Sequence, residues 1–272
     1  MDRIATPLLA MLASFSTAAA DLVAHAEWQR HFEARGVRGT FVLLDPANDR
    51  YLVLDPARAK RGFLPASTFK IPNALIGLEV GSITDENEIF HWDGKPKLRA
   101  AWERDHTLGS GMCESVVWMF QEIARRTGKQ RMREWVEKLE YGNGDIRGGI
   151  DLFWLQGNLR VSAMQQVDFL RRLAEGELPM SQRSQRLVRQ ALVRARDGGD
   201  ILYGKTGSSG AVKDPVDWWV GWIERQGRPH AYFAMNLTPA AGTRYEDRFA
   251  IARDILREAG YRIPARMNDC TN

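Results

Sequence analysis

Runs of apolar, β-branched and aromatic residues near both ends of the chain predict the strands of a sheet. Near the N-terminus, "GTFVLLD" (39–45) and "RYLVLD" (50–55) flank a short polar turn, a pattern typical of a β-hairpin. Near the C-terminus, a hairpin turn at Gly227-Arg228 is expected between the last two of three such runs. These runs are "ILYGKTG" (201–207), "DWWVGWIER" (217–225) and "HAYFAMNL" (230–237).

Between these strands, apolar residues recur at helical spacing. Gly-rich and polar stretches such as "YGNGDIRGG" separate candidate helices at 67–79, 115–127, 129–139, 162–175 and 181–196. Helices are also expected near the two ends of the chain, over 21–36, where Gly36 is the stop, and over 244–260.

This order of elements predicts an α+β fold, with an antiparallel sheet flanked by helices and a mainly helical lobe beside it. We expect one domain over 21–272, with a sheet lobe of about 21–60 and 200–272 and a helical lobe of about 61–199. A cleft between two such lobes is the natural place for a ligand.

Composition and charge exclude several classes of partner. The 272 residues are 44% hydrophobic and 26% charged, which is ordinary for a soluble globular protein. The net charge of +4 comes without a block of like charges, and no zinc-finger spacing or RNA-binding motif occurs, so we expect no nucleic acid partner. The five histidines are scattered and no H-E-x-x-H motif occurs, so we expect no metal.

Residues 1–20 have the pattern of a secretory signal peptide. The apolar run "IATPLLAMLASFSTAAA" ends in small residues, and cleavage is expected after Ala20 or after Ala26. A buried N-terminal helix is the alternative interpretation. No other segment is long enough to cross a membrane. We therefore expect a periplasmic protein, monomeric or homodimeric, without a membrane span in its mature chain.

The two cysteines, Cys113 and Cys270, could pair in an oxidising compartment. Because Cys113 falls in a segment expected to be buried and Cys270 in a C-terminal tail, we favour two unpaired thiols.

The stretch "LPASTFKIPNALIGLE" places Ser67 and Lys70 three residues apart, on one face of a helix. A serine hydroxyl becomes a useful nucleophile when a base removes its proton, and a lysine can be that base if burial lowers its pKa. The apolar residues that follow favour such burial. The alternative is a helix-capping hydroxyl and a lysine that reaches solvent.

Three more elements follow along the chain. "GKTGSSG" (204–210) offers a cation, a hydroxyl and an approachable backbone at Lys205, Thr206 and Gly207, which would suit a substrate carboxylate. Ser115-Val116-Val117 and Tyr141-Gly142-Asn143 precede it. Each element alone is explained by a turn or, for Ser115, by a helix N-cap. All occur once, in one order, which favours a shared site.

The ordered set resembles the penicillin-recognising serine enzymes, and among them the class D β-lactamases, or oxacillinases. Class A enzymes carry S-D-N where this chain has S-V-V, which favours class D. The resemblance runs from about 24 to 263 and rests on "PASTFKIPNALIGLE", "AWERDHTLGSGM", "SVVW", "YGN", "DLFWLQGNLRVSA", "GKTGSSG", "WWVGW" and "FAMN".

The resemblance implies the fold of the serine β-lactamases and transpeptidases, and catalytic roles for the matching residues. Ser67 would be the nucleophile that opens the β-lactam ring, and Ser115 would relay a proton to the leaving nitrogen. Lys70 would be an N6-carboxylysine formed with CO2 or bicarbonate, without any other cofactor, and its carbamate would be the general base.

The resemblance also implies a binding site for small-molecule β-lactam substrates. Lys205, Thr206 and Arg248 would hold the substrate carboxylate beside Gly207, with Arg244 as the alternative to Arg248. Backbone N–H groups of Ser67 and Ser208 would form the oxyanion hole. The pocket residues implied by the family are Val117, Phe120, Tyr141, Asn143, Trp154 and Leu155.

Within that set, Val117, Phe120, Trp154 and Leu155 would form an apolar wall, and the Trp154 indole N–H would donate to the carbamate. Tyr141 and Asn143 would shape the cleft. Ser208 stands where many members have a larger residue, and Cys113 is also unusual. Both departures concern substrate range.

Two other functions stay open at this point. One is a penicillin-binding transpeptidase or carboxypeptidase, which is acylated by β-lactams and deacylates poorly. The other is a non-enzymatic β-lactam sensor domain. The apolar wall with Trp154 favours a hydrolase over the first, and the lack of a long membrane segment favours it over the second.

Overall fold

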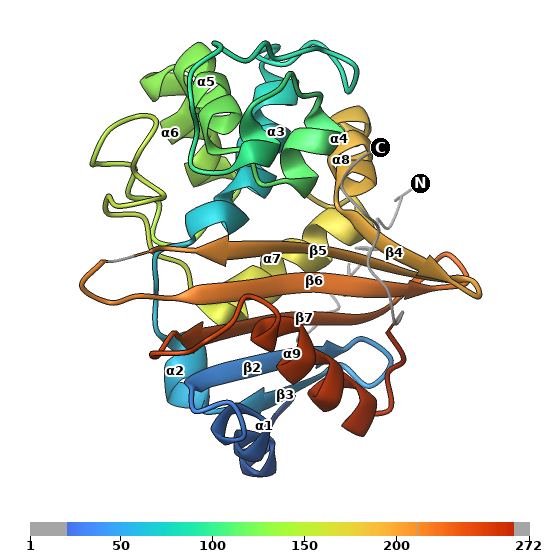
Figure 1. Cartoon of the computed structure of the whole chain (residues 1–272). Helices are drawn as coiled ribbons and strands as arrows, with labels where there is room; N and C mark the ends of the chain where they lie inside the picture. Colours follow the sequence, from blue (N-terminus) through green and yellow to red (C-terminus); the bar gives the residue numbers. More distant parts are fainter. Residues whose placement is uncertain (1–20, 211, 264–272) are drawn as a thin grey trace, which may run out of the picture.

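The computed structural model describes residues 21–210 and 212–263, in which the strands form one seven-stranded sheet (Figure 1). The strand order is β1-β3-β2-β7-β6-β5-β4. The strands are β1 (Asp21–Ala24), β2 (Arg38–Asp45), β3 (Arg50–Leu54), β4 (Val193–Asp197), β5 (Asp200–Ser208), β6 (Asp217–Arg225) and β7 (Arg228–Thr238). Every neighbouring pair is antiparallel except β1 with β3, which is parallel. The predicted α+β fold is confirmed, and the sheet is mixed because of β1.

Helices cover both faces of the sheet and build a lobe beyond its β4–β5 edge (Figure 1). Helix α7 packs against β2, β6 and β7, while α1 and α9 cover the opposite face. The α-helices are α1 (Gln29–Glu33), α2 (Pro56–Lys60), α3 (Lys70–Glu79), α4 (Leu108–Cys113), α5 (Val117–Thr127), α6 (Lys129–Lys138), α7 (Ala163–Glu175), α8 (Gln182–Ala191) and α9 (Asp247–Glu258). The short 3-10 helices are η1 (Ala26–Trp28), η2 (Ala66–Phe69) and η3 (Ala100–Trp102).

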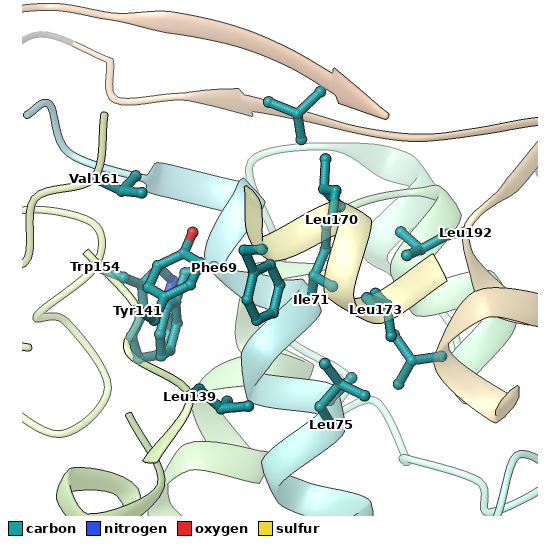
Figure 2. Packing of buried hydrophobic residues seen from close by; sticks show 14 of the residues in the cluster. Phe69, Ile71, Leu75, Leu139, Tyr141, Trp154, Val161, Leu170, Leu173 and Leu192 are labelled. Carbon is teal, nitrogen blue, oxygen red and sulfur yellow. The ribbon is translucent and has the colours of Figure 1, made fainter. Parts of the chain in front are cut away.

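The alternation of side chains along the strands divides the apolar residues between two cores. In β6, Trp218 and Trp222 face the core shared with the helical lobe, whereas Trp219 and Ile223 face the core under α9. The first core surrounds Phe69, which follows the predicted nucleophile (Figure 2). The sheet therefore positions the start of α3 through direct packing.

The predicted helix over 21–36 is wrong at its start. Asp21–Ala24 is a strand that pairs with β3, in register from Asp21 opposite Arg50 to Ala24 opposite Val53. The helical residues that follow are only η1 and the five-residue α1. An available sheet edge overrode a weak local helical preference.

The predicted helix over 181–196 is wrong at its end. Helix α8 stops at Ala191, and Val193–Asp197 is β4, which pairs with β5 across a turn at Gly198 and Gly199. Both glycines have positive φ, which glycine adopts without steric cost. In the last hairpin the turn residues are Gln226 and Gly227, one position earlier than expected, and both have positive φ.

The expected pair of unpaired thiols is wrong for Cys113, which is disulfide-bonded. The other cysteine of the chain, Cys270, lies outside the described residues. The predicted signal peptide over 1–20 also lies outside them. Across residues 21–210 and 212–263, no helix combines the length and apolarity that crossing a bilayer requires.

Candidate active site

Ser67 lies in the tight turn that leads into α3. It belongs to η2, and the preceding Ala66 has a φ of 48°, in the left-handed region that side-chain-bearing residues rarely adopt. Two backbone-directed hydrogen bonds hold this conformation: Ala66 N donates to Trp154 O at 3.0 Å, and Thr68 Oγ1 donates to Pro65 O at 2.7 Å. The strained turn fixes the direction of the Ser67 side chain.

Lys70 is fully buried at the first position of α3, one turn after Ser67. Its Nζ lies 2.7 Å from Ser67 Oγ and 5.5 Å from the centre of the Phe120 ring. Burial, with a smaller contribution from the positive charge of Arg99, lowers the pKa of Lys70 to about 7. A large part of the population therefore carries a neutral amine near neutral pH.

Trp154 supplies an unused hydrogen-bond donor in the same apolar region. Its ring is buried and stacks on Phe69 with centroids 5.4 Å apart, beside Tyr141 (Figure 2). Its Nε1 is buried, and within the described chain nothing accepts a hydrogen bond from it. An unsatisfied buried donor costs about 1–3 kcal/mol, so this position favours an added acceptor.

Ser115 and Lys205 form a second serine–lysine pair. Lys205 Nζ lies 2.8 Å from Ser115 Oγ and 3.1 Å from Thr206 O. Ser115 does not cap a helix, because the N-cap of α5 is Val116, and Ser115 has a φ of 58° in the link after α4. The pair joins the helical lobe to strand β5.

Lys205 is 2% exposed, and its pKa lies well below the usual value for lysine. Burial is the main cause, and the positive charges of Lys70, Arg194 and Arg248 add to it. The lowered pKa weakens the hold of Lys205 on its proton, so Lys205 can pass a proton to Ser115 and take one back.

Strand β5 reaches the turn that carries Ser67 through Gly207. A Cβ at this position would lie 2.9 Å from Pro65 O and 3.2 Å from Thr68 Cγ2. Because that spacing leaves no room for a side chain, glycine lets the Lys205-Thr206-Gly207 backbone lie directly against η2. The K-T-G motif and Ser67 thus share one site.

The two arginines considered for the substrate carboxylate lie in different surroundings. Arg248 is buried, with Nη2 at 2.9 Å from Asp217 Oδ2 and Nη1 donating to Gly207 O at 3.1 Å, and it lines the pocket that contains Ser67. The Arg244 side chain is 75% exposed, pairs with Asp247 at 3.2 Å and does not line that pocket.

The pocket that contains Ser67 has a volume of about 220 Å³. Of the predicted wall residues, Val117 and Leu155 line it, whereas Phe120 and Trp154 lie behind this surface in the core. The lining residues are Ser67, Leu98, Arg99, Trp102, Ser115, Val117, Leu155, Thr206, Gly207, Ser208, Gly210, Tyr245 and Arg248.

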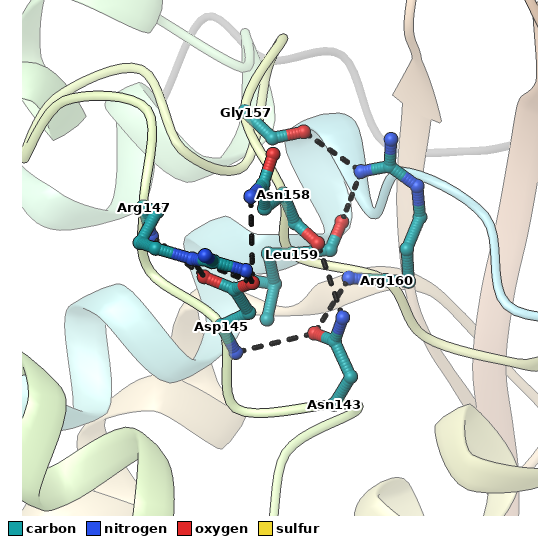
Figure 3. Close-up of polar contacts among 7 residues, drawn as sticks. All are labelled: Asn143, Asp145, Arg147, Gly157, Asn158, Leu159 and Arg160. Carbon is teal, nitrogen blue, oxygen red and sulfur yellow. Dashed lines mark hydrogen bonds and ion pairs between the residues drawn. The ribbon is translucent and has the colours of Figure 1, made fainter.

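Tyr141 and Asn143 do not line this pocket. The Tyr141 ring lies edge-on to Phe69, and its hydroxyl donates to Gln166 at 3.4 Å. Asn143 accepts from Arg160 N at 3.0 Å and donates to Asn158 O at 3.1 Å (Figure 3). The Asn143 contacts join the two ends of the loop over 143–160, which carries Trp154 and Leu155, and the Tyr141 contacts anchor the chain just before this loop to the core.

Sequence patterns missed four residues at the pocket mouth: Leu98, Arg99, Trp102 and Tyr245. Leu98 and Arg99 come from an irregular segment, and Trp102 is the last residue of the short η3. Tyr245 precedes α9, and its hydroxyl lies 3.2 Å from Thr206 Oγ1. The tripeptide motifs carried no signal for these positions.

Comparison with protein families and known proteins gives a consistent result. The model of the penicillin-binding protein transpeptidase domain matches residues 39–257. The β-lactamase OXA-10 from Pseudomonas aeruginosa is 40% identical over 96% of this chain and 98% of its own length. The β-lactamase OXA-48 from Klebsiella pneumoniae is 39% identical over 92% of this chain and 94% of its own.

Solved structures agree. The crystal structure of FUS-1 (OXA-85), a class D β-lactamase from Fusobacterium nucleatum subsp. polymorphum, aligns with a TM-score of 0.83 and 36% identity, covering 87% of this chain and 98% of that one. The class D β-lactamase YbXI from Nostoc aligns with a TM-score of 0.81 and 34% identity, covering 88% and 100%.

Proposed function

The chain belongs to the class D β-lactamases, enzymes that hydrolyse β-lactams, and from this membership we propose the mechanism of this protein. Ser67 forms an acyl-enzyme with the opened β-lactam, and Lys70 acts as an N-carboxylated general base. The observation that carries the proposal is a pair of serines that line one pocket, each held by a buried lysine behind it, with Nζ–Oγ distances of 2.7 and 2.8 Å.

Lys70 is suited to carboxylation for two physical reasons. The reaction with CO2 requires a neutral amine, and burial lowers the pKa of Lys70 to about 7. The buried, unused indole N–H of Trp154 in the adjoining core is a donor that suits the added carboxylate. When present, this group supplies a base that accepts the proton of Ser67 and later that of water.

Acylation uses the other residues around Ser67. The Ser67 hydroxyl attacks the β-lactam carbonyl, and the backbone N–H groups of Ser67 and Ser208 are the proposed donors to the developing oxyanion. Ser115 donates its proton to the lactam nitrogen as the C–N bond breaks and takes a proton from the ammonium of Lys205, 2.8 Å away, which in turn regains the proton that Ser67 gave up. Water then hydrolyses the acyl ester and restores Ser67.

The substrate carboxylate binds beside β5 in this proposal. Lys205, Thr206 and Arg248 offer two positive groups and a hydroxyl next to Gly207. Arg248 serves better than Arg244 because it is buried, lines the pocket and is held in place by Asp217. Because Arg248 forms an ion pair with Asp217, it orients the substrate carboxylate and adds little net positive charge to this side of the pocket.

Turnover of a chromogenic cephalosporin by the purified protein tests the proposal. We expect steady hydrolysis that is lost in Ser67→Ala. A single stoichiometric burst, followed by a stable acyl-enzyme in mass spectrometry, would instead identify a penicillin-binding enzyme or a sensor domain.

A separate measurement tests the carboxylated lysine. In CO2-depleted buffer below pH 7, where Lys70 is mostly protonated, we expect activity to fall and added bicarbonate to restore it. An enzyme that is equally active with and without bicarbonate under these conditions would exclude the carbamate as the base.

We also propose export to the periplasm, with cleavage after Ala20. Strand β1 begins at Asp21 and pairs with β3, so cleavage after Ala26 would remove an edge strand, whereas cleavage after Ala20 keeps it. N-terminal sequencing of the protein from a periplasmic extract should read Asp-Leu-Val-Ala. A sequence that begins at Glu27 would contradict the proposed cleavage position.

A further inference from the structure

The pocket mouth carries a cation that the proposed mechanism does not use. Arg99 lines the pocket together with Ser67 and Ser208, immediately before η3. Its side chain is exposed, and its guanidinium carbon lies 5.6 Å from the centre of the Trp102 ring. This cation–π contact restrains the charge at the mouth without neutralising it.

Among the described residues, Arg99 has no acidic partner, unlike the two nearby cations Lys97 and Arg248. Lys97, two residues earlier, pairs with Asp93 at 2.6 Å, and Arg248 across the pocket pairs with Asp217 at 2.9 Å. Within the described part of the chain, no carboxylate lies within ion-pair distance of Arg99, and no Asp or Glu lines the pocket. The pocket thus presents one uncompensated guanidinium to whatever enters.

The charge of Arg99 also acts on the buried basic residues around the pocket. It is among the causes that lower the pKa of Lys70, of Lys205 and of Arg248. A group that acts on all three is near enough to act on a bound substrate as well. The ring carboxylate of a β-lactam is already matched by Lys205, Thr206 and Arg248, so Arg99 is available for a second negative group.

We propose that Arg99 is a specificity residue that binds a second carboxylate, on the acyl side chain of the substrate, so that the enzyme favours dianionic over monoanionic penicillins. The planar guanidinium can donate two parallel hydrogen bonds to a carboxylate, which adds orientation to the charge attraction. This inference rests on the proposed β-lactam hydrolysis and extends it to the class of substrate.

Two penicillins that differ by a single carboxylate, benzylpenicillin and carbenicillin, provide the test. In Arg99→Gln, kcat/KM for carbenicillin should fall about five- to twentyfold, mainly through KM, while that for benzylpenicillin changes less than about threefold. Arg99→Lys should recover part of the loss, because lysine restores the positive charge but not the planar guanidinium with its paired N–H donors. The selective loss should shrink in 0.5 M NaCl, where exposed charges are screened.

Arg257→Gln is the matched control, since it removes the same charge from an exposed position near the end of α9. It should leave the ratio of the two kcat/KM values unchanged. An equal loss for both penicillins in Arg99→Gln would overturn the inference and leave the proposed hydrolysis standing. Failure of the wild-type protein to hydrolyse either penicillin would overturn the proposed function, and the inference with it.

Discussion

The two serine–lysine pairs have nearly equal geometry and very different surroundings. Ser67 and Lys70 come from one turn of chain and lie 2.7 Å apart at Oγ and Nζ, against the aromatic wall of Phe120. Ser115 and Lys205 come from opposite lobes, lie 2.8 Å apart and are surrounded by other cations. Within the described residues, neither lysine forms an ion pair with a carboxylate.

The difference shows how one residue type serves two purposes. Lys70 owes its lowered pKa chiefly to burial, and the region around it keeps an unused donor at Trp154 Nε1. That environment favours gaining a group that accepts hydrogen bonds. Lys205 is additionally repelled by positive neighbours and already contacts Ser115 and Thr206 O, which favours a lysine that gives up and regains a proton readily.

Removing Lys70 should have the largest effect. Lys70→Ala should lower the steady-state rate of β-lactam hydrolysis at least about 1000-fold, because both acylation and deacylation lose their base. Mass spectrometry of the protein after mixing with substrate should show any acyl-enzyme persisting. Lys129→Ala, at an exposed position on α6, is the control and should retain full activity. A Lys70→Ala enzyme that deacylates normally would refute the base assignment.

Removing Lys205 should have a smaller effect, of about 100- to 1000-fold on kcat/KM, because acid–base relay and carboxylate binding are weakened while the nucleophile keeps its base. Ser115→Ala should cost a similar factor. The double variant Ser115→Ala/Lys205→Ala should be far less impaired than the product of the two single effects, since the residues act as a unit. If the loss in the double variant equals the product of the two single losses, Ser115 and Lys205 act independently and the prediction is wrong.

Replacing Trp154 by phenylalanine should lower activity less than removing either lysine. It tests the hydrogen-bond donor that distinguishes the surroundings of Lys70 from those of Lys205. Trp154→Phe keeps a ring that stacks on Phe69 and removes the indole N–H. We expect activity at ambient CO2 to fall about tenfold, because one hydrogen bond to a charged group is lost, and to recover with bicarbonate. Trp222→Phe, which alters a buried indole elsewhere in the same core, should show no bicarbonate dependence. A carbamate signal of unchanged intensity in 13C NMR of Trp154→Phe would contradict this role.

The smallest expected effect concerns stability. In CO2-free buffer at pH 6, Lys70→Met should raise the free energy of unfolding by roughly 1–2 kcal/mol, because a buried cation is replaced by an apolar side chain. In the wild-type protein, the buried charge of Lys70 lowers the free energy of unfolding most below pH 7, where Lys70 is protonated in both the folded and the unfolded chain. This effect declines between about pH 7 and 10.5, where the unfolded chain binds the proton and the folded chain does not. The gain in Lys70→Met, measured by urea unfolding, should therefore shrink as pH rises through this range.

The sequence predicted most of the sheet because its central strands are long and continuously apolar. The run 217–225 was predicted with the bounds of β6 itself, since a strand covered on both faces is apolar along its middle, here from 218 to 223. The edge strands were missed. "DLVA" is short, and "VRARD" is polar and follows a real helix, so only pairing with β3 or β5 decides their conformation.

The candidate site also contains features that the sequence predicted and features that it did not. The motifs brought Ser67, Lys70, Ser115 and Lys205 to one place, because catalytic chemistry restricts those residue types strongly. No pattern indicated the left-handed backbone of Ala66 and Ser115, which depends on contacts across the lobes. Nor did any pattern indicate Arg99, which we propose as a specificity residue because no carboxylate in the described part of the chain pairs with it.

The contact at Gly207 ties catalytic competence to completion of the chain. Ser67 and Lys70, the proposed nucleophile and base, lie in the first third of the sequence, yet the strand that meets their turn through Gly207 comes from the last third. A nascent or truncated polypeptide that ends before β5 holds Ser67 and Lys70 but has no partner for Ser115. Enzymatic activity is therefore a reporter of successful maturation, and during biosynthesis the ability to open a β-lactam ring arises only once the sheet has closed.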